Sequence, residues 1–119
     1  MKALTQKEEE IMNHLWANGE MLIRELQTLY DDPKPHVNTL ATLVKILEEK
    51  GFVAHRAITT RCFKYYAQIS REQYRDRSLA RVVDKLFDKS YLGVVSALVN
   101  EEKISVDDLK ELIRQIEGE

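Results

Sequence analysis

The sequence predicts a mainly α fold with one small β-hairpin (α+β), and three observations predict it. Apolar residues recur at helical spacing in six segments of the 119-residue chain. Two short β-rich runs, at about 52–57 and 62–69, flank a polar turn. Positive charge is concentrated in these runs and the helix that precedes them. Residues 34–64 hold six Lys or Arg against two acids, a local charge of +4 in a chain of net charge −2. An acidic protein with one basic segment is typical of directed contact with a polyanion.

The first part of the chain is expected to form two helices. Thr5-Gln6-Lys7-Glu8 has the form of a capping box, and Asn18-Gly19 ends the first helix if Gly19 takes the left-handed conformation. A second helix is expected from about Met21 to Tyr30, before the prolines at 33 and 35 break it. The sequence leaves open whether a short β-element forms near residues 19–21. The inward residues would be Ile11, Met12, Leu15, Trp16, Leu22, Ile23, Leu26 and either Leu29 or Tyr30.

A third helix should begin near His36 or Val37 and end at Gly51. Its buried stripe, at i, i+3, i+4 and i+7, would be Leu40, Leu43, Val44 and Leu47. The opposite face carries Asn38, Thr42, Lys45 and Glu49. Two strands follow at 52–57 and 62–69, joined through Ile58-Thr59-Thr60-Arg61.

The second part of the chain is expected to hold three more helices. Ser70-Arg71-Glu72-Gln73 would cap a helix to about Asp88, the run 91–99 is very apolar, and Ser105 to Asp108 would cap the last helix. The expected domains are therefore 1–69 and 70–119. Three short helices cannot bury this many apolar residues by themselves, so a homodimer is expected, and a single compact helical domain is the alternative. The expected dimerisation residues are Leu79, Val83, Leu86, Phe87, Tyr91, Val94, Val95, Leu98, Leu109, Leu112, Ile113 and Ile116.

Helices followed by a basic hairpin indicate a winged helix-turn-helix that binds DNA. Asn38, Thr42 and Lys45 would meet base edges in the major groove. The hairpin would contact the backbone or the minor groove, and a two-fold dimer would bind a palindromic site. The expected DNA-binding residues are Lys34, His36, Asn38, Thr39, Thr42, Lys45, Arg56, Thr60, Arg61 and Lys64.

Other interpretations stay open. The polar face of the third helix could be a solvated surface, and a winged helix can serve protein–protein contact without DNA. Cys62 is either a small core residue or, beside Arg61 and Lys64, a redox-sensitive thiol. An enzyme is not expected, because no catalytic set or phosphate loop is present. One cysteine and three separated histidines predict no metal and no cofactor. Without a secretory signal or a long apolar run, no membrane insertion and a cytoplasmic location are expected.

Three segments, LTQKEEEIMNHLW, VNTLATLVKILEEKGFVAHR and FKYYAQISREQY, resemble the penicillinase-repressor family of bacterial transcription regulators. This family includes repressors of β-lactamase and methicillin-resistance genes and copper-responsive relatives. The resemblance implies a winged helix that binds operator DNA, a dimerising helical arm, and cleavage of that arm after a signal from a membrane sensor-protease. The cut would fall at Ala97-Leu98, where the resistance-gene members have Asn-Phe. The carboxy-terminal cysteine cluster of the copper-responsive relatives is missing.

Overall fold

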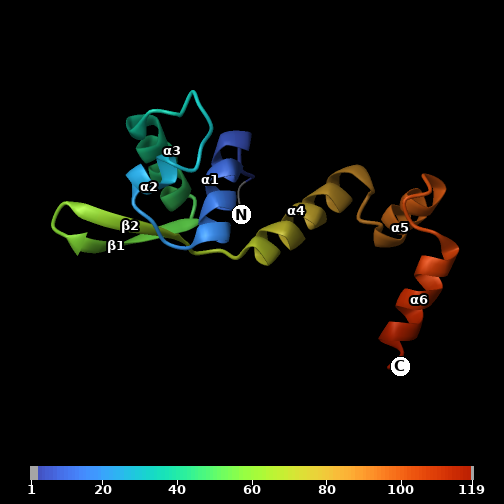
Figure 1. Cartoon of the computed structure of the whole chain (residues 1–119). Helices are drawn as coiled ribbons and strands as arrows, with labels where there is room; N and C mark the ends of the chain where they lie inside the picture. Colours follow the sequence, from blue (N-terminus) through green and yellow to red (C-terminus); the bar gives the residue numbers. More distant parts are fainter. Residues whose placement is uncertain (1–2, 119) are drawn as a thin grey trace. The chain divides into compact units, whose positions relative to one another are not determined.

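A computed structural model describes residues 3–118 (Figure 1). The expected α+β class is confirmed, since the described residues are mostly helical with one two-stranded antiparallel hairpin. The elements in chain order are α1 (Gln6–Asn18), α2 (Ile23–Gln27), α3 (Val37–Glu49), β1 (Val53–Thr59), β2 (Cys62–Ala67), α4 (Arg71–Leu86), α5 (Tyr91–Asn100) and α6 (Val106–Ile116).

The chain divides into two compact units, the first ending at Arg77 and the second beginning at Ser78. This division falls inside α4, later than the boundary expected at residues 69 and 70. Residues 71–77 of α4 belong to the first unit, where the Tyr74 ring packs on Trp16 and on Phe52, with ring centroids 5.8 Å apart in both pairs. The capping pair expected at the start of α4 is present, with the Gln73 backbone N–H donating to Ser70 Oγ at 3.0 Å.

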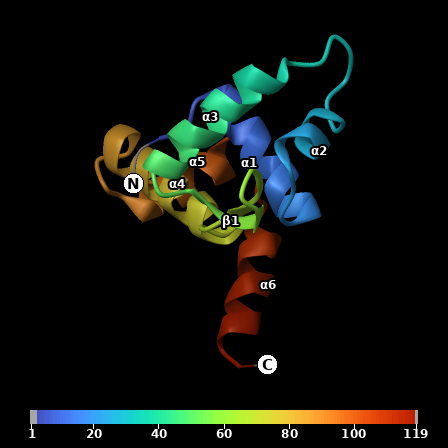
Figure 2. The same cartoon turned by 90° about the vertical axis from the view of Figure 1, so that its left-hand side faces the viewer.

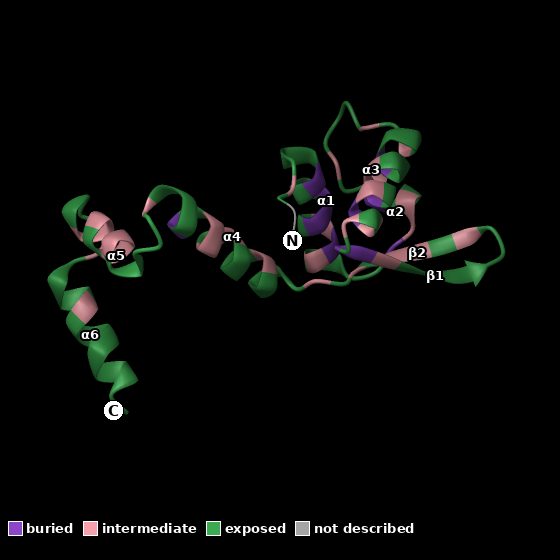
Figure 3. Ribbon diagram, turned by 180° about the vertical axis from the view of Figure 1, so that it is seen from behind, coloured by how far each residue is buried: buried purple, intermediate pink, exposed green. Residues whose placement is uncertain are grey.

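The core of the first unit lies where α1, α2, α3 and the base of the hairpin meet. The predicted stripe of α3 is confirmed, because Leu40, Val44 and Leu47 are buried and Leu43 is half-buried. Figure 3 shows these buried positions concentrated along α1, α3 and the start of β1. The buried apolar residues of this unit are Ile11, Met12, Leu15, Met21, Leu26, Leu40, Val44, Leu47, Phe52 and Val53.

The predicted capping box of α1 is confirmed. The Glu8 backbone N–H donates to Thr5 Oγ1 at 3.2 Å, and the Thr5 backbone N–H donates to Glu8 Oε1 at 2.8 Å. The helix ends at Asn18 as expected, but Gly19 combines φ +79° with ψ −163° and is therefore not left-handed helical. This extended ψ leads the chain straight into the sheet, which the left-handed conformation would not do.

The second helix is shorter than predicted, because its expected first turn pairs with the hairpin instead. Met21 forms an antiparallel bridge with Tyr65, with N–O distances of 3.0 and 2.9 Å, so helix α2 spans only Ile23–Gln27. The prediction of a helix over 21–30 was wrong at both ends, and the β-element left open near 19–21 exists. Leu26 is buried, Leu29 is exposed, and Tyr30 is the residue that packs against the core.

Both strands differ from their predicted ranges, because β1 begins at Val53 and continues past residue 57, while β2 ends at Ala67 rather than at residue 69. Strand β1 runs to Thr59, so the turn consists of Thr60 and Arg61 rather than the four residues predicted. Paired residues on the two strands point to the same side of the sheet. His55 and Tyr65 face one side, and Arg56 and Lys64 face the other. The side with His55 is the one toward α3, because its Nδ1 is hydrogen-bonded to Glu48 near the end of that helix. Figure 2 shows α3 above the hairpin in this view.

The second unit consists of the rest of α4 together with α5 and α6. Serine caps begin both short helices, and the predicted Ser105–Asp108 box is present, with two 3.0 Å hydrogen bonds. Among the described residues from Ser78 onward, Val83 is the only fully buried apolar residue (Figure 3). No helix within residues 3–118 combines the length and the apolar composition of a membrane span.

Candidate nucleic-acid interface

Helix α3 exposes Asn38, Thr42 and Lys45 along one face, as the helical spacing predicts. The Thr42 hydroxyl donates to the Asn38 carbonyl oxygen at 3.0 Å, which restricts its rotamer while the residue stays exposed. Within the described residues Lys45 has no hydrogen bond or ion pair. An amide, a hydroxyl with a methyl group, and an ammonium can together contact adenine, thymine and guanine edges in a major groove.

The start of α3 is held by His36, whose Nδ1 accepts a hydrogen bond from the Asn38 backbone N–H at 3.1 Å. A ring nitrogen that accepts carries no proton, so the proton of the neutral ring is on Nε2. That N–H is a donor suited to a phosphate beside the helix N-terminus. Lys34 donates to the carbonyl oxygens of Thr28 and Tyr30, so its ammonium is tied to the loop before α3. Thr39 lies apart, lining a hollow of about 280 Å³ beside α1.

The hairpin separates its basic residues. Arg56 and Lys64 lie opposite each other, on the side away from His55. Arg56 is not a free cation, because its Nε and Nη2 donate to the two carboxylate oxygens of Glu20 at 2.9 and 2.5 Å. These hydrogen bonds, with the charges of Arg56 and Lys64, hold the pKa of Glu20 below its usual value. Glu20 therefore stays ionised near neutral pH, and no local sequence pattern indicates that it neutralises a residue 36 positions away.

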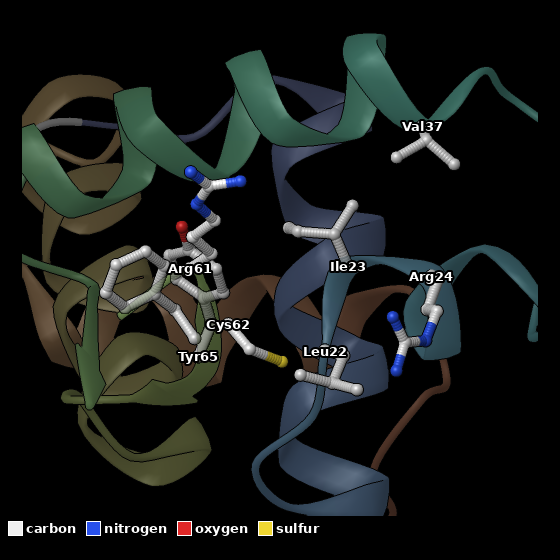
Figure 4. A pocket seen from close by; sticks show the side chains of 8 residues that line it. Leu22, Ile23, Arg24, Val37, Arg61, Cys62 and Tyr65 are labelled. Atoms are coloured by element: carbon white, nitrogen blue, oxygen red, sulfur yellow. The ribbon is translucent and has the colours of Figure 1, made fainter. Parts of the chain in front are cut away.

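Thr60 and Arg61 form the turn of the hairpin, and Arg61 borders an open groove of about 250 Å³. Figure 4 shows the Arg24 side chain on the opposite side of this groove from Arg61. Neither guanidinium has an ion-pair partner among the described residues. Arg24 was missed by the sequence reasoning, because it lies in a segment with an excess of acids. The groove is lined by Leu22, Ile23, Arg24, Val37, Arg61, Cys62, Phe63 and Tyr65.

Cys62 is half-buried in the same groove, and its sulfur points toward Leu22 (Figure 4). This apolar contact is what a small packing residue makes. Redox sensing by Cys62 stays a prediction.

Two of the six cations counted in residues 34–64 are paired with acids from outside that segment. Lys50 Nζ lies 2.8 Å from Glu8 Oε1, and Arg56 is bound to Glu20. Including Glu8 and Glu20 lowers the local charge from +4 to +2. Among the described residues, the cations of this segment without an acidic partner are therefore Lys34, Lys45, Arg61 and Lys64. Arg24 lies with Arg61 beside the groove.

The residues expected to dimerise differ widely in exposure. Val83 is buried and so is not available to a partner in this conformation. Both Ala97 and Leu98, where cleavage is expected, are half-buried inside α5. The half-buried set is Phe87, Val94, Val95, Leu98 and Leu109, and the exposed set is Leu79, Leu86, Tyr91, Leu112, Ile113 and Ile116.

The comparison with known families agrees with the resemblance seen in the sequence. The family model described as penicillinase repressor matches residues 4–118, nearly the whole chain. A search of curated proteins found no match. Proteins of the matching family are transcriptional repressors that bind DNA. No group of three or more potential metal ligands occurs among the described residues. The chain belongs to the penicillinase repressor family.

Proposed function

We propose that this protein represses transcription by binding a palindromic operator as a homodimer, with α3 in the major groove of each half-site. The observation that carries this proposal is the exposed set Asn38, Thr42 and Lys45 on a helix whose other face is buried. These side chains are free of competing side-chain partners in the described structure, so they can be used for base edges. A helix anchored by three buried residues also keeps its reading face rigid.

Phosphate contacts would come from the residues that flank α3. Arg24 and Arg61 border the groove beside Val37 at the helix start, and His36 adds its Nε2 donor. Guanidinium groups bind phosphate through paired N–H donors, and such contacts fix the register of a protein on the duplex without reading sequence. Arg24 therefore extends the site that the sequence predicts.

Dimerisation is supported by the apolar surface of the second unit. Leu86 is 71% exposed and Ile116 is 74% exposed, and Leu112 and Ile113 are about half exposed. Each side chain that a partner covers contributes roughly 1.5–3 kcal/mol. A second copy of the chain offers the same apolar helices, and a two-fold pair delivers two α3 helices to one palindrome.

Selection from a pool of random duplexes tests this function. The expected product is a palindromic sequence with half-sites separated by about one helical turn, roughly 10 base pairs, or a multiple of it. Light scattering of the complex should give two chains for each duplex. Enrichment of a sequence without two-fold symmetry, bound by one chain, would contradict the proposal.

Induction by cleavage of the arm is a separate proposal, carried by the resemblance. The Ala97-Leu98 bond lies inside α5, so α5 must unwind locally before a protease can bind it in an extended form. Mass spectrometry of the chain from induced cells tests this step. A chain that stays intact while the target genes are transcribed would exclude cleavage as the switch.

A further inference from the structure

On one side of the hairpin, the cation Arg56 already forms an ion pair with an acid of the same chain. Arg56 donates through Nε and Nη2 to both oxygens of Glu20, at 2.9 and 2.5 Å. Lys64 lies directly opposite Arg56 on the neighbouring strand. Together with Glu20 and Glu25, Lys64 lines a hollow of about 300 Å³. Two cations and two acids share this side, so its local charge is zero.

The geometry of this pair is the one that a guanidinium uses for a phosphate group. Two roughly parallel N–H donors meet two oxygens of one anion, whether it is a carboxylate or a phosphate. Both side chains are open to water, with 55% of Arg56 and 34% of Glu20 exposed. An exposed pair is held weakly, so a competing anion can exchange with the carboxylate at small cost.

We propose that Glu20 acts as an internal competitor for DNA phosphate, holding Arg56 out of the interface and limiting the affinity of the hairpin for any duplex. This inference rests on the proposed DNA binding and adds to it an affinity-setting residue outside the basic segment. The alternative role is a brace, in which Glu20 holds Arg56 and the hairpin in the conformation that binds DNA. The two roles predict opposite changes when the carboxylate is removed.

Glu20→Gln separates the two roles because it removes the charge and keeps the size of the side chain. A freed Arg56 can neutralise one more phosphate per protomer, so in the proposed homodimer the plot of log affinity against log salt steepens by about 1.8. Over a fourfold range of salt, from about 50 to 200 mM, this difference amounts to about 12-fold in the affinity ratio of variant to wild type. The affinity gain is therefore largest at low salt.

Glu25→Gln is the matched control. Glu25 lines the same hollow as Glu20, and its Oε1 accepts a hydrogen bond from the Leu22 backbone N–H, which a glutamine oxygen can also accept. This change removes one negative charge from the same place without releasing Arg56. The double variant Glu20→Gln with Arg56→Gln completes the set, because it removes the cation that the proposal sets free.

The experiment measures binding of the full-length chain and these variants to a fluorescein-labelled duplex of random sequence, by anisotropy across the salt range. Thermal unfolding of each variant confirms that it is folded. The expected result is tighter binding and a steeper salt slope for Glu20→Gln, a smaller change without a steeper slope for Glu25→Gln, and loss of the extra slope in the double variant. Weaker binding by Glu20→Gln would show a brace, and equal effects of Glu20→Gln and Glu25→Gln would show net charge alone. Failure of wild type to bind any duplex would instead contradict the proposed function.

Discussion

Lys50 Nζ lies 2.8 Å from Glu8 Oε1 and joins the end of α3 to the start of α1. The Glu8 side chain is 3% exposed and the Lys50 side chain 19%, so the pair is largely shielded from water. The same carboxylate oxygen accepts from the Thr5 backbone N–H. One acid therefore caps α1 and also fixes the helix that carries the candidate reading face.

Replacing Lys50 by Met should destabilise the first unit. The change leaves the Glu8 carboxylate buried without its cation, and breaking such a pair costs about 3 kcal/mol, the lower end of the range for buried pairs. Urea unfolding followed by circular dichroism measures the difference. Lys45→Met is the control, because Lys45 is exposed without a partner among the described residues, and it should stay within about 0.5 kcal/mol of wild type.

Acid should weaken the same contact. Burial raises the pKa of Glu8, but hydrogen bonds from Lys50 and Thr5 outweigh it and hold the pKa below the ordinary value of 4.5. A carboxyl with a lowered folded-state pKa contributes stability that is fully present above 4.5 and is lost as pH falls through the folded-state pKa. Unfolding free energies of wild type and Glu8→Gln, compared across this range, should converge toward acid pH. A constant difference between them would show that Glu8 is not the titrating group.

Asn38→Ala and Thr42→Val should each reduce affinity for the operator by about 1–3 kcal/mol, with little change on random DNA. Thr42→Val keeps a methyl group and removes the hydroxyl that donates to the Asn38 carbonyl. Titration of both duplexes with each variant measures the effect. Equal losses on the two duplexes would assign these residues to the phosphate backbone instead.

Arg24→Ala and Arg61→Ala should weaken binding to every duplex to a similar extent. Each change removes one phosphate contact per protomer, so the salt slope should become shallower by about one unit for each bound protomer. The slope is measured on random and operator DNA with both variants. Lys103→Ala is the control, since this exposed cation lies in the second unit. A slope unchanged by Arg24→Ala would remove that residue from the interface.

The sequence predicts α3 well, because its buried stripe and its polar face follow one helical period with no competing long-range contact. It predicts α2 poorly. Met21 has helical neighbours in sequence, but its backbone hydrogen bonds go to Tyr65, which no local pattern reveals. Helical spacing places Leu29 and Tyr30 equally well at an inward position. The structure shows that Tyr30 is the one that packs against the core.

The candidate site likewise depends on long-range contacts that local sequence patterns do not reveal. Local spacing identifies the exposed positions of α3, but ion pairing depends on residues that are distant in sequence. Glu8 and Glu20 neutralise Lys50 and Arg56 across intervals of 42 and 36 residues, which a charge count over one segment cannot include. Arg24 enters the groove for the same reason, because folding places it near the hairpin turn.

Leu112→Asp should dissociate the proposed homodimer and reduce DNA affinity with it. Leu112 is 51% exposed, so an aspartate there is tolerated by the folded chain but not by an apolar interface. Sedimentation velocity at micromolar concentration measures the oligomeric state. Lys110→Asp on the same helix serves as the control for added negative charge. A Leu112→Asp monomer that retains full operator affinity would show that the arm does not couple the two DNA-binding units.

The salt dependence of duplex binding by the unmodified protein tests the central claim most directly, because the claim is that α3 and the hairpin neutralise phosphates. The logarithm of the affinity should fall linearly with the logarithm of salt concentration between about 50 and 200 mM, with a slope of about −0.9 for each phosphate contacted. An affinity that stays flat over this range would contradict DNA binding through this surface.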